Sequence, residues 1–331
     1  MMKTMKPMQL LRVAGAIGIL TWLLSKAGFS EVREHLVSAS AGLLAIAVFA
    51  AAGESFLRIL NWRQLLHSMH PVRSGYLRLS SSYFYSALLG QFVPSTVGTD
   101  AIRVVVAQKS FGGSPAVYAA SLVVLNAITL FVSAALGLGA LLWLWSADTL
   151  PQRLVPAIPV LLAIVLLVPT VHFTLRSRRG LVVLALRRIR PRRLYRLRRG
   201  LRRFVDSLLV FERSPAAHMR GVLVTSFFVV LAQVCFFALL AGAFGVSVPL
   251  VMWLAMPSMM AIAGMLPLSI FGFGLLQGAL VFLVTSFGVP PSSALACALV
   301  AGFVSTTVFL ALGGIAFATW TGPSPSPTER A

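Results

Sequence analysis

Residues 115–145 read PAVYAASLVVLNAITLFVSAALGLGALLWLW, and no Asp, Glu, Lys or Arg interrupts this stretch. A run of about 20 predominantly apolar residues is long enough to cross the core of a bilayer as an α-helix. The whole chain has a similar character: 58% of its 331 residues are hydrophobic and 11% are charged, against roughly 25% charged in an average soluble domain. The sequence therefore predicts an all-α, polytopic helical integral membrane protein and excludes a soluble globular fold.

Other apolar runs predict the remaining membrane spans. We expect a retained first span over residues 13–24, because basic residues precede it and no cleavage site follows it. The further spans are expected over residues 36–60, 155–175, 219–244, 275–288 and 293–320. The run over 275–288 is short for a full crossing, so the total is seven or eight spans and the side of the C-terminus stays open. The Pro- and Ser-rich tail from 321 to 331 is predicted to be disordered.

Most of the net charge of +20 lies in one loop. Residues 176–203 contain thirteen arginines and no acidic residue, so the positive-inside rule predicts that this loop is cytoplasmic. Within it, apolar residues recur at spacings of three and four from Leu194 to Leu208, which predicts an amphipathic helix on an anionic membrane surface. The arginines expected to contact that surface are Arg192, Arg196, Arg199 and Arg203. Nucleic acid is not expected as a partner, because the flanking spans hold the loop against lipid phosphates.

Two interrupted segments lie at corresponding places in the two halves of the chain. The segment 79–98 breaks at Val93-Pro94-Ser95-Thr96-Val97-Gly98, and its basic flanks favour a re-entrant hairpin that returns to the cytoplasm. The segment 250–274 breaks at Pro257, Gly264, Pro267, Gly272 and Gly274. A pair of such breaks indicates a substrate site at the centre of an inverted repeat. Simple packing kinks are the alternative, because Gly and Pro are common in membrane helices.

A half-helix that begins after such a break directs its free N–H groups inward, where a phosphate or carboxylate can bind. Asp100 and Arg103 share a helix face, so we expect Arg103 to grip a phosphate and Asp100 to orient it. Ordinary charges at the membrane interface are the alternative for this pair. The predicted substrate-binding residues are Pro94, Ser95, Gly98, Asp100, Arg103, Pro267, Ser269, Gly272, Gly274 and Gln277.

Other polar residues are given structural roles or none. Glu54 and Arg58, four residues apart near the inner end of the second span, are expected to form a structural ion pair. Asn126, within a span, is expected to join helices. His67 and His70 have no Cys, Asp or Glu nearby to complete a metal site. The chain has no P-loop, no HExxH and no Ser/His/Asp set, so we expect no metal, no cofactor and no enzymatic activity.

Three motifs resemble the lysylphosphatidylglycerol synthase transmembrane region, whose members are also called flippase-like domain proteins. They are Arg58…Asn61-Trp62-Arg63-Gln64-Leu65-Leu66, Phe92-Val93-Pro94-Ser95-Thr96-Val97-Gly98-Thr99-Asp100-Ala101-Ile102-Arg103, and Leu266-Pro267-Leu268-Ser269 with Gly272-Phe273-Gly274. The resemblance covers about residues 10–320. Full-length lysyl-lipid synthases of this family add an aminoacyl-transferase domain, whereas about eleven residues follow the last span here. The resemblance therefore implies the membrane module alone, which moves a lipid or lipid-linked molecule between leaflets.

Two departures from the family pattern concern the second half. Leu276 and Gln277 stand where members often have an Arg-Glu pair, and Phe271 stands where members tend to have Gly. A mechanism that needs a charged pair in the second half is therefore not expected. In the first half, Thr99 replaces a frequent Gly, while Asp100 and Arg103 match the pattern.

Together these features predict a flippase-like transporter in the bacterial inner (plasma) membrane, acting without ATP hydrolysis on a phospholipid or a lipid-linked anionic substrate. The N-terminus and the arginine-rich loop are expected in the cytoplasm. The alternative is a membrane scaffold that recruits a cytoplasmic glycosyl- or aminoacyl-transferase through that loop. The expected organisation is a first membrane half over 1–175, the basic loop over 176–218, a second half over 219–320 and the tail over 321–331.

Overall fold

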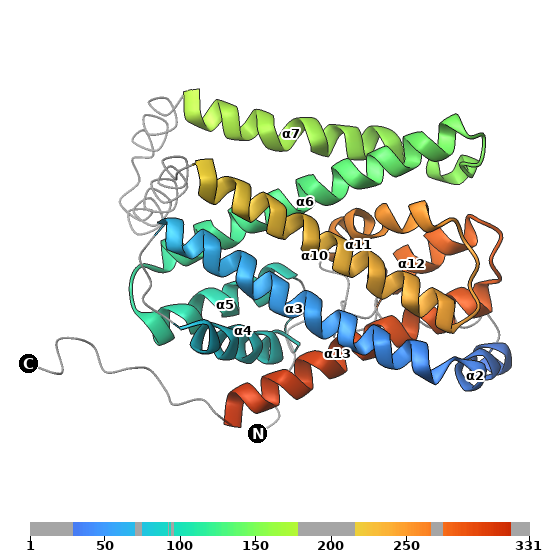
Figure 1. The fold of residues 1–331 in the computed structure, drawn as a ribbon, viewed down its shortest axis with the longest axis horizontal. Coiled ribbons are helices and arrows are strands. Elements are labelled where there is room, and N and C mark those ends of the chain that lie inside the picture. The colour runs from blue at the N-terminus through green and yellow to red at the C-terminus, as the bar shows by residue number, and fades with distance from the viewer. Residues whose placement is uncertain are drawn as a thin grey trace, which may run out of the picture.

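The computed structural model describes residues 29–69, 75–91, 93, 96–177, 216–265 and 274–318, and all regular secondary structure in these parts is helical. The predicted all-α class is therefore confirmed. Long helices lie side by side along the long axis of the molecule (Figure 1). The elements are α2 (Phe29–Ser38), α3 (Ala41–Met69), α4 (Tyr76–Gly90), α5 (Thr96–Phe111), α6 (Pro115–Ser146), η1 (Gln152–Leu154), α7 (Ala157–Ser177), α10 (Ala216–Ala243), η3 (Leu250–Leu254), α11 (Met256–Met265), α12 (Leu275–Thr285) and α13 (Pro291–Ala318).

Five helices within the described parts are long and apolar enough to cross a membrane. They are Ala41–His67, Pro115–Ser146, Gln152–Val171, His218–Ala243 and Pro291–Ala318. Large apolar side chains on their outer faces, such as Phe49, Leu166 and Phe303, are exposed, as expected for surfaces that contact lipid. The chain is thus a multi-pass membrane protein. The predicted span 13–24, the arginine-rich loop and the tail 321–331 lie outside the described residues.

Two predicted spans have the wrong boundaries. The span expected over 36–60 is divided, because α2 ends at Ser38 and α3 begins only at Ala41. Serine side chains compete for backbone hydrogen bonds and favour helix ends, and the Ser40 N–H donates to the Ala243 carbonyl at 3.0 Å. The mixed segment before residue 36, expected as a loop, is therefore part of helix α2. The span expected over 275–288 is α12, whose 11 residues extend about 16 Å and cannot cross a core of roughly 30 Å alone.

The motif Asn61-Trp62 fixes α3 against two neighbours. The Asn61 amide donates to the Ser226 hydroxyl of α10 at 2.8 Å, and the Trp62 indole donates to the Ser121 hydroxyl of α6 at 3.0 Å. Trp62 is 0% exposed. The indole therefore joins α3 to α6 inside the helix bundle, with its N–H partnered as is usual for a buried tryptophan.

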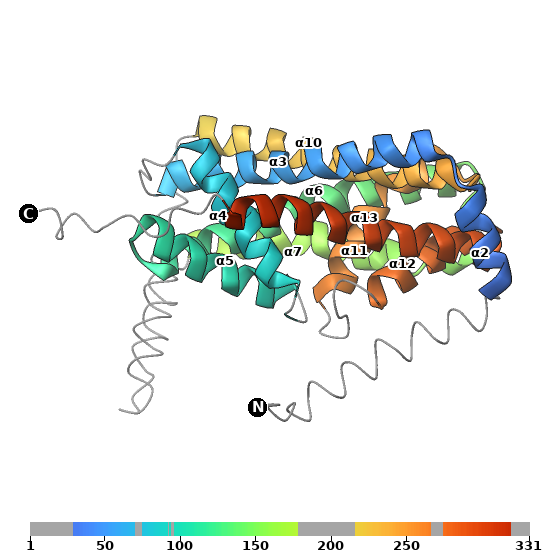
Figure 2. The ribbon, with the colours of Figure 1, turned by 90° about the horizontal axis from the view of Figure 1, so that it is seen from below.

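Two helical hairpins flank α13, which packs against both α4 and α12. Helices α4 and α5 lie side by side and have 15 and 16 residues, or about 22 and 24 Å (Figure 2). Their approach needs Gly90, because a Cβ at this position would lie 2.5 Å from Cγ2 of Thr99. Helices α11 and α12 form the second pair.

The predicted break at Pro257 lies at a junction between two helices, since η3 ends at Leu254 and α11 begins at Met256. This proline occupies the first turn of α11, which begins at Met256, and a proline is tolerated there because the first N–H groups of a helix have no intrahelical acceptor. Gly90 and Gly264 each lie a few residues before the proline of a predicted break, Pro94 and Pro267. Both glycines lie at the C-terminal end of a helix, α4 and α11 respectively. The following helices begin at Thr96 and Leu275, so the two intervening segments differ in length.

Candidate functional site

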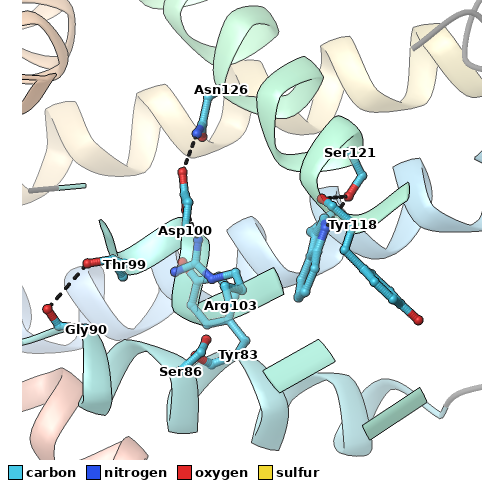
Figure 3. A network of polar contacts seen from close by, with 10 residues as sticks. Tyr83, Ser86, Gly90, Thr99, Asp100, Arg103, Tyr118, Ser121 and Asn126 are labelled. Carbon is cyan, nitrogen blue, oxygen red and sulfur yellow. Dashed lines mark hydrogen bonds and ion pairs between the residues drawn. The ribbon is translucent and has the colours of Figure 1, made fainter. Parts of the chain in front are cut away.

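The charged residues of the first half gather among α3, α4, α5 and α6. The guanidinium Nη1 of Arg103 donates to Oδ1 of Asp100 at 2.8 Å, so the two predicted partners form an ion pair (Figure 3). The amide of Asn126 on α6 donates to Oδ2 of the same carboxylate at 2.7 Å. Both oxygens of Asp100 are therefore held, one by its own helix and one by a neighbouring helix.

Arg103 is held on its other side by an aromatic ring. Its guanidinium carbon lies 4.2 Å from the ring centroid of Tyr83, which comes from α4. This distance is within the range of a cation–π interaction, which keeps the planar group parallel to a fixed surface. The Arg103 side chain is 12% exposed, and its Nε is buried without a hydrogen-bond partner. An unpaired buried N–H raises the free energy of the folded protein. A bound molecule whose oxygen accepted a hydrogen bond from this Nε would therefore be stabilised.

A second ion pair lies on α3. Nε of Arg58 donates to Oε1 of Glu54 at 2.6 Å, with the two side chains 30% and 15% exposed respectively. The predicted pair is thus confirmed, but its predicted place near the inner end of the span is wrong. Glu54 is the central residue of the span Ala41–His67, about 20 Å along the helix from either end. The difference arises because the helix continues past Leu60, so that the span ends at His67.

The two ion pairs lie near each other, since Arg58 is close enough to Asp100 for the opposite charges to attract. We name the whole group the polar cluster: Glu54, Arg58, Tyr83, Asp100, Arg103 and Asn126. Its two arginines and two carboxylates sum to zero charge. Ionised groups at membrane depth are costly and usually mark a path for ions or substrate.

A cavity of about 170 Å³ lies where the two hairpins meet. Gln91 directly follows α4, and Gln277 lies in the first turn of α12, so both interrupted segments contribute to this one cavity. Ser305 and Thr306 of α13 add hydroxyl groups. The other lining residues are Phe236, Phe237, Met260, Leu276, Leu280, Ala298, Ala301, Gly302 and Phe309. The cavity is therefore mostly apolar with a few neutral hydrogen-bonding groups.

Gln277 also has a structural task at the start of α12. Its Oε1 accepts a hydrogen bond from the Gly274 N–H at 2.7 Å, which caps the helix, and its side chain is buried. Gly274 has a φ of 119°, which residues with a Cβ rarely adopt. Gly274 and Gln277, both predicted to bind substrate, therefore have a structural role at the N-terminus of α12. Only Gln277 also lines the cavity.

The structure tests the predicted site residues unevenly. It brings Asp100 and Arg103 together, and it puts Gly98 in the first turn of the same helix, α5. It adds Tyr83, Gln91, Ser305 and Thr306, which the sequence did not single out. Within the described residues, no group of three or more His, Cys, Asp or Glu side chains could hold a metal ion. Pro94, Ser95, Pro267, Ser269, Gly272, Arg192, Arg196, Arg199 and Arg203 lie outside the described residues.

These features define a multi-pass α-helical membrane protein with ionised groups among its helices and two hairpins around a cavity. The model of the family "Lysylphosphatidylglycerol synthase TM region" matches residues 9–313, and the chain belongs to this family. The resemblance of the three motifs is thereby confirmed. No curated protein and no solved structure matches the chain significantly.

Proposed function

We propose that this protein is a flippase-like transporter, which moves a lipid or a lipid-linked anionic molecule between the leaflets without ATP hydrolysis. The polar cluster is the observation that supports this function most. Its pair Asp100–Arg103 carries a buried donor without a partner, Nε of Arg103, and ionised groups among membrane helices often mark a substrate path. Membership of the lysylphosphatidylglycerol synthase transmembrane family supports a function carried out within the membrane.

Arg103 is the residue proposed to bind the phosphate of the substrate. A guanidinium offers several N–H donors in one plane. Arg103 can therefore release the Asp100 carboxylate and bind a phosphate in its place, so that it has an anionic partner before and after the exchange. Tyr83 holds the face of the guanidinium while its edge changes partner. Asn126 holds the Asp100 carboxylate during this exchange, so that the ion pair can re-form after release.

The hairpins α4–α5 and α11–α12 are proposed to be re-entrant segments of an inverted repeat. The lengths of α4, α5 and α12 support this, since each is shorter than the roughly 30 Å bilayer core. Neutral groups in the cavity between the hairpins, such as Gln91 and Thr306, are suited to hydrogen bonds with a headgroup. Rocking of one repeat against the other would then expose the site alternately to each leaflet.

The energy source and the orientation are part of the same proposal. The sequence contains no P-loop for ATP, so movement is passive or driven by a gradient. We place the protein in a bacterial plasma membrane with the N-terminus and the loop 176–203 in the cytoplasm, in agreement with the positive-inside rule.

The test is leaflet exchange in liposomes that contain labelled anionic phospholipids. Wild-type protein should accelerate exchange, and Arg103→Ala should reduce the rate by about tenfold or more, the factor expected for one lost charge-assisted hydrogen bond. Arg153→Ala is the matched control, because Arg153 is exposed and lies outside the polar cluster. If the wild-type rate equals that of Arg103→Ala or of protein-free liposomes across a panel of lipids, the proposal is wrong.

A further inference from the structure

A second cavity, of about 370 Å³, lies between α3 and α10. It is lined by Leu60, Arg63, Gln64, His67, His218 and Gly221. This volume is in the range of small-molecule sites. Arg63 follows Arg58 by five residues, or about 140° around the helix, so this cavity opens on a different face of α3 from the polar cluster.

The cavity carries positive charge without a matching acid. Within the described residues, no carboxylate lies within 4.0 Å of Arg63, His67 or His218. Nε of Arg63 is buried and has no hydrogen-bond partner. Its guanidinium carbon lies 6.0 Å from the ring centroid of Tyr76, whose hydroxyl donates to the Phe56 carbonyl at 3.0 Å. Arg63 therefore has a buried donor that neither an acid nor the nearby ring satisfies.

The hydrogen bonds around the cavity also orient donors. Nδ1 of His67 lies 2.9 Å from the Arg63 carbonyl, which can only accept, so Nδ1 carries the hydrogen. Nε2 is then an acceptor in the neutral ring and becomes a donor when the ring is protonated. The Thr225 hydroxyl lies 2.9 Å from the Gly221 carbonyl and 3.1 Å from the side-chain amide of Gln64, which ties this amide to α10.

We propose that this cavity binds a phosphate group through Arg63, His67 and His218. The group is either free phosphate or the phosphate of a lipid headgroup. The cavity lies at the C-terminal part of α3 and the first turn of α10, and α10 follows the arginine-rich loop in sequence. The ligand is therefore expected from the side of that loop. This site does not depend on the proposed lipid transport.

The experiment measures binding of ³²P-labelled inorganic phosphate by equilibrium dialysis, with the full chain in nanodiscs of zwitterionic lipid. Wild-type protein should bind phosphate saturably. Arg63→Gln should weaken binding by about tenfold or more. The double variant His67→Gln/His218→Gln should also weaken binding, and it keeps the test valid if Arg63→Gln does not fold, because both histidines are exposed.

Two further measurements correct for nonspecific phosphate binding and distinguish free phosphate from a lipid headgroup as the ligand. The arginine-rich loop is identical in every variant, so its nonspecific binding cancels, and Arg153→Gln should bind as wild type does. Displacement of the labelled phosphate by short-chain phosphatidylglycerol assigns the site to a lipid headgroup, and resistance to displacement assigns it to free phosphate. Wild-type binding that is undetectable, or that all the cavity variants match, would overturn the proposal.

Discussion

The amide nitrogen of Asn126 lies 2.7 Å from Oδ2 of Asp100, which joins α6 to the hairpin formed by α4 and α5. The two residues are 26 positions apart. Because the other oxygen of Asp100 accepts from Arg103, this hydrogen bond fixes the plane of the carboxylate and, through it, the position of the guanidinium. The geometry of the proposed phosphate-binding arginine therefore depends on a neutral residue of another helix.

The first prediction concerns the coupling of these two residues. Asn126→Ala should destabilise the protein by about 1 kcal/mol, less than the usual contribution of a hydrogen bond to a charged group, because Asn126 is exposed. Asp100→Ala should cost more, because it also leaves Arg103, 12% exposed, without its counter-ion. In a double-mutant cycle measured by urea or thermal unfolding in detergent, the two effects should not add. Additive effects would show that the hydrogen bond contributes nothing.

The second prediction separates structure from function in the pair Glu54–Arg58. Either single change, Glu54→Leu or Arg58→Leu, leaves an uncompensated charge at mid-span and should lower the melting temperature. The double change should restore most of that loss, because replacing a whole buried ion pair by apolar residues is often neutral. We expect the double variant to retain leaflet exchange. A folded double variant without exchange would instead assign this pair to substrate handling.

The third prediction uses two adjacent glycines of α13. A Cβ at Gly313 would lie 2.7 Å from Cβ of Leu88 and 3.0 Å from the carbonyl oxygen of Phe84, so Gly313→Ala must push α13 away from α4. We expect a loss of about 1–3 kcal/mol, as for other overpacked sites. Gly314→Ala is the matched control. A Cβ there would meet nothing within 4 Å, and alanine favours helix by up to about 1 kcal/mol. Equal melting temperatures of the two variants would contradict the close packing.

The fourth prediction tests the alternative of a recruiting scaffold. Replacing residues 181–204 by a Gly/Ser linker of equal length keeps Arg176, Arg178 and Arg179 to hold the loop in the cytoplasm. A transporter should retain leaflet exchange in liposomes after this change. The scaffold hypothesis predicts instead that capture of a cytoplasmic glycosyl- or aminoacyl-transferase is lost. Loss of exchange in a correctly inserted variant would argue against an intrinsic transport activity of the membrane helices.

Hydropathy alone located most of the long helices. It succeeded for α6 and α13 because membrane spans are long, apolar and free of charge, properties that a sequence window measures directly. It failed at the α2–α3 junction, where Leu36 and Val37 continue the apolar run although the helix ends at Ser38. The serines that end the helix are a weak local signal, and the contact of Ser40 with the end of α10 is a tertiary feature.

The candidate site was predictable only where its partners share a helix. Asp100 with Arg103, and Glu54 with Arg58, follow from spacings of three and four residues on one helix. Tyr83 comes from a different helix, and nothing in the Ser- and Tyr-rich stretch around it indicates which ring meets an arginine. The burial of Trp62 was also not predictable, because its hydrogen-bond partner Ser121 lies on another helix and tryptophans in membrane proteins are often interfacial.

The zero net charge of the polar cluster has a consequence for the direction of transport. A neutral site adds no counter-charge, so an anionic headgroup that crosses the membrane through it carries its full charge through the transmembrane voltage. Each elementary charge is worth about 2.3 kcal/mol per 100 mV. With the cytoplasm negative, the voltage favours export of an anionic lipid and opposes its return, whereas a zwitterionic lipid is moved equally in both directions. The headgroup itself would thus decide whether this protein acts as an exporter or as a simple equilibrator of the two leaflets.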